Sequence, residues 1–422
     1  MTRTLHLSVT QRTYPGGRRR ITRLTPDDGG PAFEVFHESE HLPELNDSTP
    51  LDGHVLGMLL HVMTDASTLI VEGAVSLGMM RNLEELQRAW TRWRPERYRI
   101  VEIRADKVVD AREARKSRAV AAFSGGADSM FAALDQVYPS KGSHPYPLTH
   151  LLMVHGFDVE VDRSYEFDRL VKRVKPFADE SGLELWTIRT NSKAKMRGWW
   201  SDTHMVELTG CMQMFAGEFD HGLVGSTESY EGLVIPWGSS PVTDHLMSSD
   251  RMEIVHVGAG YSRTEKIDFI ADHPTACHAL KVCWEGQNQA ENCGECEKCM
   301  RTKMNFLAAG RPIPPCFATG VDVKDVLALK VYNEVQRGEL RAILKAAESR
   351  SMTDPWVGAL RRRVRRPLTP TGAGFVRQFV YPTVERLGLK PTLKQARAWV
   401  HANLAGSGAA SSFPTPVARP TH

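Results

Sequence analysis

The chain has 422 residues, of which 41% are hydrophobic and 24% are charged. Its 53 Lys and Arg nearly balance its 50 Asp and Glu, and a formal net charge of +3 argues against a protein that binds polyanions over its whole surface. This is the composition of a globular protein, and the length allows two or three domains.

Targeting and membrane segments are not apparent in the sequence. The stretch 1–20 lacks the apolar core of a secretory signal and contains Arg18-Arg19-Arg20. Apolar runs such as 55–60 are far shorter than the ~20 residues of a membrane helix. Four of the seven cysteines lie between Cys283 and Cys299, which favours a metal site over disulfides. We therefore expect a cytoplasmic protein with no membrane partner.

Residues 1–117 are predicted to form an α+β appendage. A strand is expected near 4–9, helices over 51–63 and 82–93, and an alternating strand at 98–103. The region contains no chemical motif, so its expected role is structural or substrate-shaping.

Residues 118–318 alternate between short apolar segments and longer helical ones. This pattern predicts a doubly wound, parallel α/β sheet, in which ligands bind at the carboxyl ends of the strands. The expected strands are 119–123, 151–154, 185–188, 222–224 and 252–255, and the clearest helix is 165–180.

Residues 319–404 are predicted to be a basic helical region, with helices near 326–347 and 393–404. From Gly320 onward there are 17 Lys and Arg but 7 Asp and Glu. The run Arg361–Arg366 could bind RNA or an acidic partner, but a charge run is more often a solvated face, so nucleic acid is not favoured. Residues 405–422, rich in Gly, Ala, Ser and Pro, are expected to be a disordered tail.

The strongest chemical signal follows the strand 119–123. Two glycines let backbone N–H groups approach an anion, and the helix that follows directs its positive N-terminus to the same place. Asp128, the acidic residue of the segment after this strand, suggests that Mg²⁺ lies between its carboxylate and the phosphate groups of a ligand. The alternative is an ordinary strand-to-helix turn with a side-chain cap. The predicted ATP-binding loop consists of Ser124, Gly125, Gly126, Ala127, Asp128 and Ser129.

The string Ser-Gly-Gly-X-Asp-Ser resembles the PP-loop of the ATP pyrophosphatases, or adenine nucleotide alpha hydrolases. That resemblance implies the PP-loop (HUP-like) α/β fold. It also implies reaction at the α-phosphate of ATP, which yields an adenylated substrate and pyrophosphate.

A second motif has the spacing C-x9-C-x2-C-x2-C. Four converging thiolates with no open coordination position are typical of a structural Zn²⁺ site. Two alternatives are an iron–sulfur cluster, which four cysteines can also hold, and unpaired core cysteines that bind no metal. The predicted ligands are Cys283, Cys293, Cys296 and Cys299. The isolated Cys211, Cys277 and Cys316 are expected to be buried apolar side chains.

The loop and the cysteine motif together resemble the 7-cyano-7-deazaguanine synthases of queuosine biosynthesis, over residues 119–310. Those enzymes activate a carboxylate with ATP and let ammonia attack it. By this resemblance Asp128, Arg263 and Lys266 would be the catalytic residues, and Arg263 or Lys266 would stabilise charge at the α-phosphate, rather than being part of a solvated helix start. Ser226 and Glu228 would contact substrate, rather than forming an ordinary polar loop, and His155 would lie near the adenine or ribose.

The sequence thus predicts a ligase-like enzyme that adenylates a carboxylate or amide oxygen and then joins it to ammonia or another amine. ATP, Mg²⁺ and Zn²⁺ are the expected cofactors, and a homodimer is one option for the assembly. Two alternatives stay open. One is a tRNA-modifying thiolase, for which Cys211 is the free thiol near the middle of the domain. The other is a nucleotide-binding partner module without turnover.

Overall fold

The computed structural model of the chain describes residues 3–196, 199–283, 286 and 288–369. It contains two compact units. One comprises Met1–Leu329 and Arg337–Arg365, and the other comprises Lys330–Gln336 and Arg366–His422. All strands of the sheet belong to the first unit.

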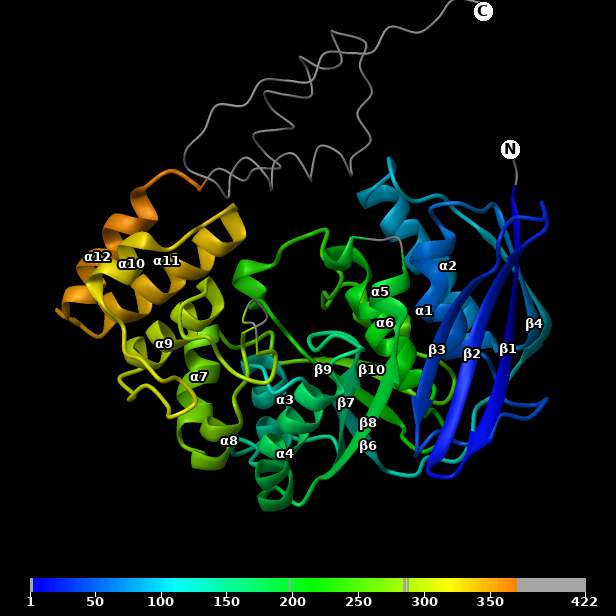
Figure 1. The fold of residues 1–422 in the computed structure, drawn as a ribbon, viewed down its shortest axis with the longest axis horizontal. Coiled ribbons are helices and arrows are strands. Elements are labelled where there is room, and N and C mark those ends of the chain that lie inside the picture. The colour runs from blue at the N-terminus through cyan, green and yellow to red at the C-terminus, as the bar shows by residue number, and fades with distance from the viewer. Residues whose placement is uncertain (1–2, 197–198, 284–285, 287, 370–422) are drawn as a thin grey trace, which may run out of the picture. The chain divides into compact units, whose positions relative to one another are not determined.

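One mostly parallel sheet of ten strands organises this first unit (Figure 1). The strand order is β10-β9-β6-β7-β8-β3-β2-β1-β4-β5, and the pairs β1–β2, β2–β3 and β3–β8 are antiparallel. The strands are Thr4–Tyr14 (β1), Gly17–Pro26 (β2), Phe33–Ser39 (β3), Thr68–Ser76 (β4), Glu102–Val109 (β5), Ala119–Ala122 (β6), Leu148–His155 (β7), Glu184–Thr190 (β8), His221–Gly225 (β9) and Glu253–Val257 (β10).

The α/β class predicted from the sequence is confirmed. Each of the five strands expected in the central region is present, and β10, β9, β6, β7 and β8 are mutually parallel. In the N-terminal region β1 agrees with the prediction, whereas the strand expected at 98–103 begins only at Glu102. The strands β2, β3 and β4 were not predicted.

The N-terminal strands continue the central sheet through β3. His37 and Glu38 pair with Thr190 and Arg189 of β8. The Ser39 hydroxyl also donates to the Thr187 carbonyl oxygen over 2.6 Å. Residues 1–117 and 118–318 therefore contribute to one hydrogen-bonded sheet.

Helices cover both faces of the sheet because the side chains of each strand alternate between them. Val120 and Ala122 of β6 belong to a core that includes α1, α2 and α6, whereas Ala119 and Ala121 pack with α3, α4, α7 and α8. The helices are Asp52–Val62 (α1), Leu77–Trp93 (α2), Ala127–Val137 (α3), Ser164–Glu180 (α4), Ser192–Lys195 (α5), Trp200–Gln213 (α6), Arg263–Ala271 (α7), Pro274–Ala279 (α8), Glu297–Ala308 (α9), Val323–Ala328 (α10), Glu334–Ser349 (α11) and Pro355–Arg365 (α12), with 3₁₀ turns Tyr230–Gly232 (η1) and Asp244–Met247 (η2).

The single helix predicted over 326–347 is two helices, α10 and α11. The break occurs because Asn333 accepts the backbone N–H of Gln336 through its side chain over 2.9 Å, the bond of a helix N-cap. The predicted helix at 393–404 and the predicted tail at 405–422 lie outside the described residues.

The strand order reverses beside β6. The chain leaves β6 for β7 on one side, while β9 and β10 lie on the other. Open α/β sheets bind ligands where the order reverses in this way, at the carboxyl ends of the strands. The segments that follow β6, β9 and β10 meet at this edge, and they contain most of the predicted site residues.

Candidate active site

The segment from Phe123 to Gly126 links β6 to α3 in a turn that its own serines hold. Ser129 Oγ accepts the backbone N–H of Ser124 over 3.2 Å and donates to the Gly126 carbonyl oxygen over 3.1 Å. Gly125 has a φ of +76°, a conformation that favours glycine. No side chain among the described residues caps the N-terminus of α3. The first turn of α3 can therefore receive an anion.

Asp128, Arg263 and Lys266 converge beside this turn. Arg263 Nη2 donates to Asp128 Oδ2 over 3.0 Å, and Lys266 Nζ lies 3.7 Å from Asp128 Oδ1. Helix α7 delivers both cations, and its N-terminus is fixed by a capping box between Ser262 and Glu265. The three residues predicted to be catalytic are thus brought together by α3 and α7.

The group formed by Asp128, Arg263 and Lys266 includes polar atoms without a hydrogen-bond partner among the described residues. Asp128 Oδ1 and Arg263 Nε are buried and have no hydrogen-bond partner among the described residues. Lys266 is 1% exposed, and its Nζ donates to the Ser226 carbonyl oxygen over 2.6 Å. Burial lowers the pKa of Lys266, although Asp128 opposes the shift. Buried groups without partners mark a place where a polar ligand is expected.

A second layer of charges surrounds Arg263. Arg301 of α9 lies 3.1 Å from both Glu297 and Glu339, the latter on α11. Burial, followed by the charge of Glu339, raises the pKa of Glu228 to about 7. Glu297, Arg301 and Glu339 could not be predicted from the sequence, because they are far from the loop in the chain and belong to no motif.

His155 and Ser226 use their side chains locally. His155 ends β7, where its ring stacks on Phe167 and its Nε2 lies 3.0 Å from the Glu160 carbonyl oxygen. Ser226 Oγ donates to the carbonyl oxygen of Glu228. Both residues are buried, so each stabilises the end of a strand in this structure.

The four predicted cysteines form one compact cluster. The Sγ atoms of Cys283, Cys293, Cys296 and Cys299 all lie within 4.8 Å of one another. Two of the separations are 3.7 and 3.9 Å, close to the ~3.8 Å edge of a tetrahedron with Zn–S bonds of ~2.3 Å. The cluster could hold a metal ion such as zinc, and backbone N–H groups of Glu295 and Cys296 point to the Cys293 sulfur.

Lys281 links the cysteine cluster to the phosphate-binding turn. Its backbone N–H donates to the Gly125 carbonyl oxygen over 2.8 Å, and its ammonium group donates to the Cys283 carbonyl oxygen. Asn292 fixes the same segment by accepting the N–H groups of Val282 and Cys283. Lys281 was not predicted to be a site residue, although its position two residues before the first cysteine of the cluster was a usable signal.

The remaining cysteines lie outside the cluster and are poorly suited to nucleophilic chemistry. Cys211 is fully buried, and burial raises its pKa strongly. Burial also raises the pKa of Cys277 to about 11 and that of Cys316 to about 12. A thiolate is the reactive form, so none of the three is activated.

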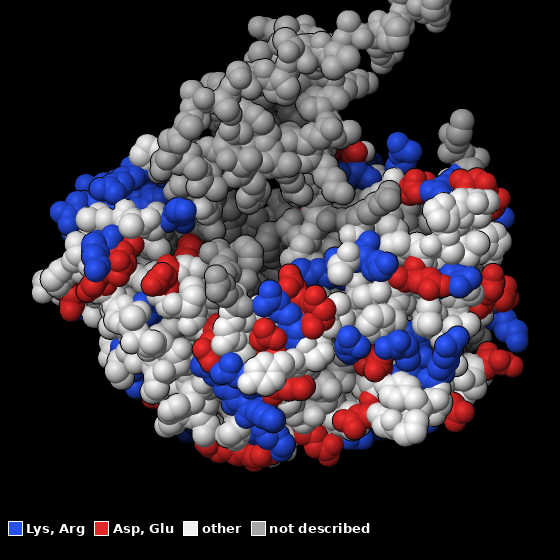
Figure 2. Space-filling model, in the orientation of Figure 1, with Lys and Arg blue, Asp and Glu red and all other residues white. Residues whose placement is uncertain are grey.

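The basic run Arg361–Arg366 lies at the end of α12. Arg361, Arg362 and Arg365 are exposed, and Figure 2 shows basic side chains gathered over this end of the first unit. Arg361 pairs with Glu348 over 2.8 Å, whereas Arg363 is buried and donates to the Leu329 carbonyl oxygen. The run is thus partly structural, and nucleic-acid binding stays a prediction.

A comparison of the chain with protein-family models, curated proteins and solved structures found no match. Among the described residues, none of the helices combines the length and apolar character that a membrane span requires.

Proposed function

We propose that the protein is an ATP-dependent enzyme of the PP-loop class, which adenylates a carboxylate or amide oxygen and transfers the activated group to a nitrogen nucleophile. The observation that carries the proposal is the convergence of Asp128, Arg263 and Lys266 on an uncapped helix N-terminus. This convergence occurs at the strand-order reversal of a parallel sheet.

The triphosphate of ATP would lie over Ser124 to Ser129. Backbone N–H groups at the start of α3 and the hydroxyls of Ser124 and Ser129 are the donors available to it. Bound Mg²⁺ would neutralise phosphate charge beside Asp128, whose Oδ1 accepts no hydrogen bond from any residue that the structure describes. Asp128 also holds Arg263 and Lys266 in place, which keeps two cations beside the reacting phosphate.

In the first step an oxygen of the acid attacks the α-phosphorus of ATP. The bond between the α-phosphorus and its bridging oxygen breaks, and pyrophosphate leaves with the electron pair. Negative charge grows on the phosphoryl oxygens as this happens. Arg263 and Lys266 are preorganised to stabilise it, so placement and electrostatics supply the catalysis.

In the second step the amine nitrogen attacks the activated carbon, and AMP leaves with the bonding electron pair. The nitrogen must also lose a proton. Glu228, with a pKa of about 7 and only 9% exposure, suits the role of proton acceptor at neutral pH.

A zinc ion is proposed for the cysteine cluster, with a structural role. Four thiolates leave no open coordination position, so zinc there would cross-link the chain and supply no chemistry to the substrate. Through Lys281, the cluster would fix the Gly125 carbonyl and hence the phosphate turn.

The thiolase alternative requires a reactive sulfur, and Cys211, Cys277 and Cys316 are buried or have raised pKa values. The other alternative is a module that binds nucleotide without turnover, and experiment must distinguish it from the proposed enzyme.

The proposal is tested by product analysis with ATP, Mg²⁺, ammonium and a panel of carboxylic acids. We expect AMP and pyrophosphate to form with at least one acid. Arg263→Gln should lower the rate about 100-fold or more, because charge on the phosphoryl oxygens loses its nearest donor. Arg88→Gln, which removes an exposed pair with Glu85, is the control and should leave the rate unchanged.

Two outcomes would count against the proposal. Formation of ADP and phosphate would mean that the γ-phosphate reacts instead. ATP binding without turnover across the whole panel would favour the non-catalytic module.

A further inference from the structure

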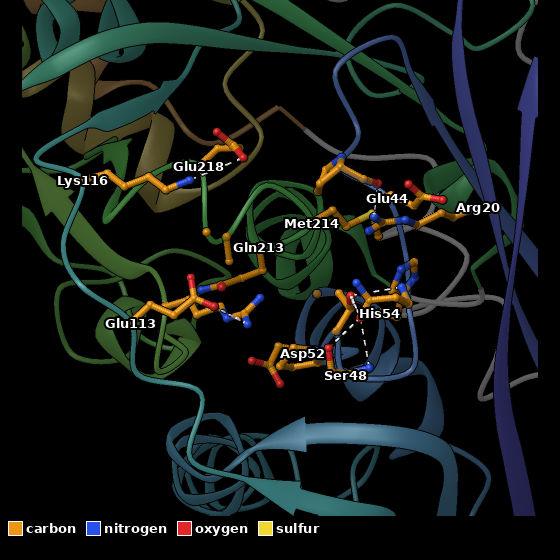
Figure 3. A pocket seen from close by; sticks show the side chains of 18 residues that line it. Arg20, Glu44, Ser48, Asp52, His54, Glu113, Lys116, Gln213, Met214 and Glu218 are labelled. Atoms are coloured by element: carbon orange, nitrogen blue, oxygen red, sulfur yellow. Dashed lines mark hydrogen bonds and ion pairs between the residues drawn. The ribbon is translucent and has the colours of Figure 1, made fainter.

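A cavity lies at the amino ends of the parallel strands, the opposite end of the sheet from the phosphate turn. It has a volume of about 370 Å³ (Figure 3). Its lining includes Glu113 and Lys116, which precede β6, and the stretch 213–218, which precedes β9. These are amino ends of parallel strands, whereas Ser124 to Ser129 follow a carboxyl end. The cavity is therefore separate from the proposed ATP site.

Arg20 of β2 contributes a buried cation without a counter-ion. It is 2% exposed, and its guanidinium donates to Gln11 Oε1 over 3.1 Å and to the Pro43 carbonyl oxygen over 2.7 Å. Within the described part of the chain no carboxylate forms an ion pair with it. Burial lowers the pKa of Arg20 to about 10, which leaves it charged at neutral pH. A buried, unpaired guanidinium is costly unless an anion joins it, and it fits a carboxylate well.

Gln213, at the end of α6, contributes an acceptor with a fixed direction. Its Nε2 donates to the carbonyl oxygens of Met247 and Met252 over 2.9 and 3.1 Å. Both amide hydrogens are therefore used, and Oε1 has no partner within the described part of the chain, although the side chain is only 4% exposed. This oxygen can be satisfied only by a donor, such as an ammonium or amide N–H.

His54 of α1 contributes a second unpaired atom. Its Nδ1 lies 2.7 Å from Thr22 Oγ1, and its buried Nε2 has no partner among the described residues. Burial holds the pKa of His54 well below its usual value, so the ring is neutral and can donate or accept. In Figure 3, His54 and Arg20 approach the cavity from one side and Gln213 from another.

The remaining charges exclude a polyanion. Arg251 is paired with Glu113, and Lys116 is paired with Glu218 over 3.5 Å. Asp52 and Glu44 also line the cavity, so its carboxylates outnumber its cations when Asp52 is ionised. A phosphate with two negative charges would meet this acidic surplus, whereas a ligand that pairs one carboxylate with one ammonium would not.

We infer that this cavity binds a small zwitterion of the free α-amino acid class. Arg20 takes the carboxylate, Gln213 Oε1 takes the ammonium group, and His54 Nε2 completes the hydrogen bonds. The inference does not depend on the ATP reaction, because none of these groups belongs to the phosphate turn.

The test is calorimetric titration of the full-length protein, free of nucleotide, with each of the twenty amino acids. Acetate and methylammonium are titrated as the two halves of the ligand. We expect at least one amino acid to bind more than 10-fold more tightly than either half. Arg20→Gln and Gln213→Leu should each weaken that binding at least 10-fold, while Arg23→Gln, an exposed neighbour on β2, should not.

Arg20 and Gln213 bond to backbone groups, so substitutions there also remove contacts that stabilise the fold, and Ser48→Trp provides an independent test. Ser48 is exposed at the rim, so a large side chain there closes the cavity and leaves the buried groups intact. Loss of binding in Ser48→Trp with an unchanged circular dichroism spectrum supports the inference. Acetate binding as tightly as every amino acid, no heat with any of them, or undiminished binding in Ser48→Trp would overturn it.

Discussion

Buried carboxylic acids in this protein have different kinds of partner. Asp128 is partly buried beside two cations, Arg263 and Lys266. Among the described residues, Glu207 of α6 accepts hydrogen bonds from two hydroxyls, Ser192 Oγ at 2.7 Å and Thr203 Oγ1 at 2.8 Å. Burial therefore raises the pKa of Glu207 to about 7, despite these hydrogen bonds. A buried carboxyl group with hydroxyl partners can thus hold a proton near neutral pH.

The pKa of Glu207 predicts a pH dependence of stability. The carboxyl ionises near pH 4.5 in the unfolded chain and near 7 in the folded protein. Between these values the folded state binds more protons, so the contribution of Glu207 to the free energy of unfolding falls as pH rises, by about 3 kcal/mol at most. Glu207→Gln removes this dependence. Urea unfolding at both ends of the window should show the variant gaining on the wild type with rising pH, and a constant difference would contradict the prediction.

Sequence patterns identified residue types for the site but not how each side chain is used. The loop, Arg263 and Lys266 could be predicted because a motif holds them at fixed spacing. The local use of the Ser226 hydroxyl and the His155 ring could not, because it depends on Glu228 and Phe167 in the folded chain. Arg20 and Gln213 gave no signal at all, since only the fold brings them to one cavity.

At the scale of elements, short connections determine where the helices begin. Cys296 is the N-cap residue of α9, which delivers Arg301 and Glu297 to the charges around Arg263. The cysteine cluster thus lies at the start of a helix that reaches the site.

Helices α1 and α6 pack closely through glycines, with Gly53 and Gly210 at the contact.

The cysteine cluster predicts one bound zinc ion per chain. Cys296→Ser should lose the metal and lower the melting temperature, because three thiolates no longer close the site. Cys277→Ser, a buried cysteine outside the cluster, should keep the metal. Elemental analysis and thermal unfolding measure both effects. Iron in the elemental analysis together with visible absorption would indicate an iron–sulfur cluster instead of zinc. A wild-type protein without metal would contradict the prediction of a metal site.

The contact between α1 and α6 predicts a steric effect at Gly53. A Cβ atom there would lie 2.5 Å from the Gly210 carbonyl oxygen. Gly53→Ala should therefore lower the free energy of unfolding by about 1–3 kcal/mol. Gly338→Ala is the matched control, because it lies in α11 with open space around it and should gain about 0.5–1 kcal/mol from helix propensity. Equal effects in denaturant unfolding would contradict this packing.

At the scale of the whole chain, the sheet joins two regions that differ in how well sequence predicts them. Strands β6 to β10 were predictable because each is a short apolar run followed by a turn or helix. Strands β2 and β3 mix charged and apolar residues, and their pairing with β1 and β8 depends on partners distant in sequence. The pairing of β3 with β8, which makes the sheet continuous, therefore could not be predicted from the sequence.

Calorimetric titration of the zinc-loaded protein with ATP and Mg²⁺ measures whether the turn from Ser124 to Ser129 binds the triphosphate of ATP. We expect saturable binding of one ATP per chain. Gly126→Val, which puts a side chain at the start of α3, should abolish that binding, whereas Gly358→Val, in open space on α12, should preserve it. Absence of heat with the wild type, or equal binding by Gly126→Val, would mean that this turn does not bind ATP.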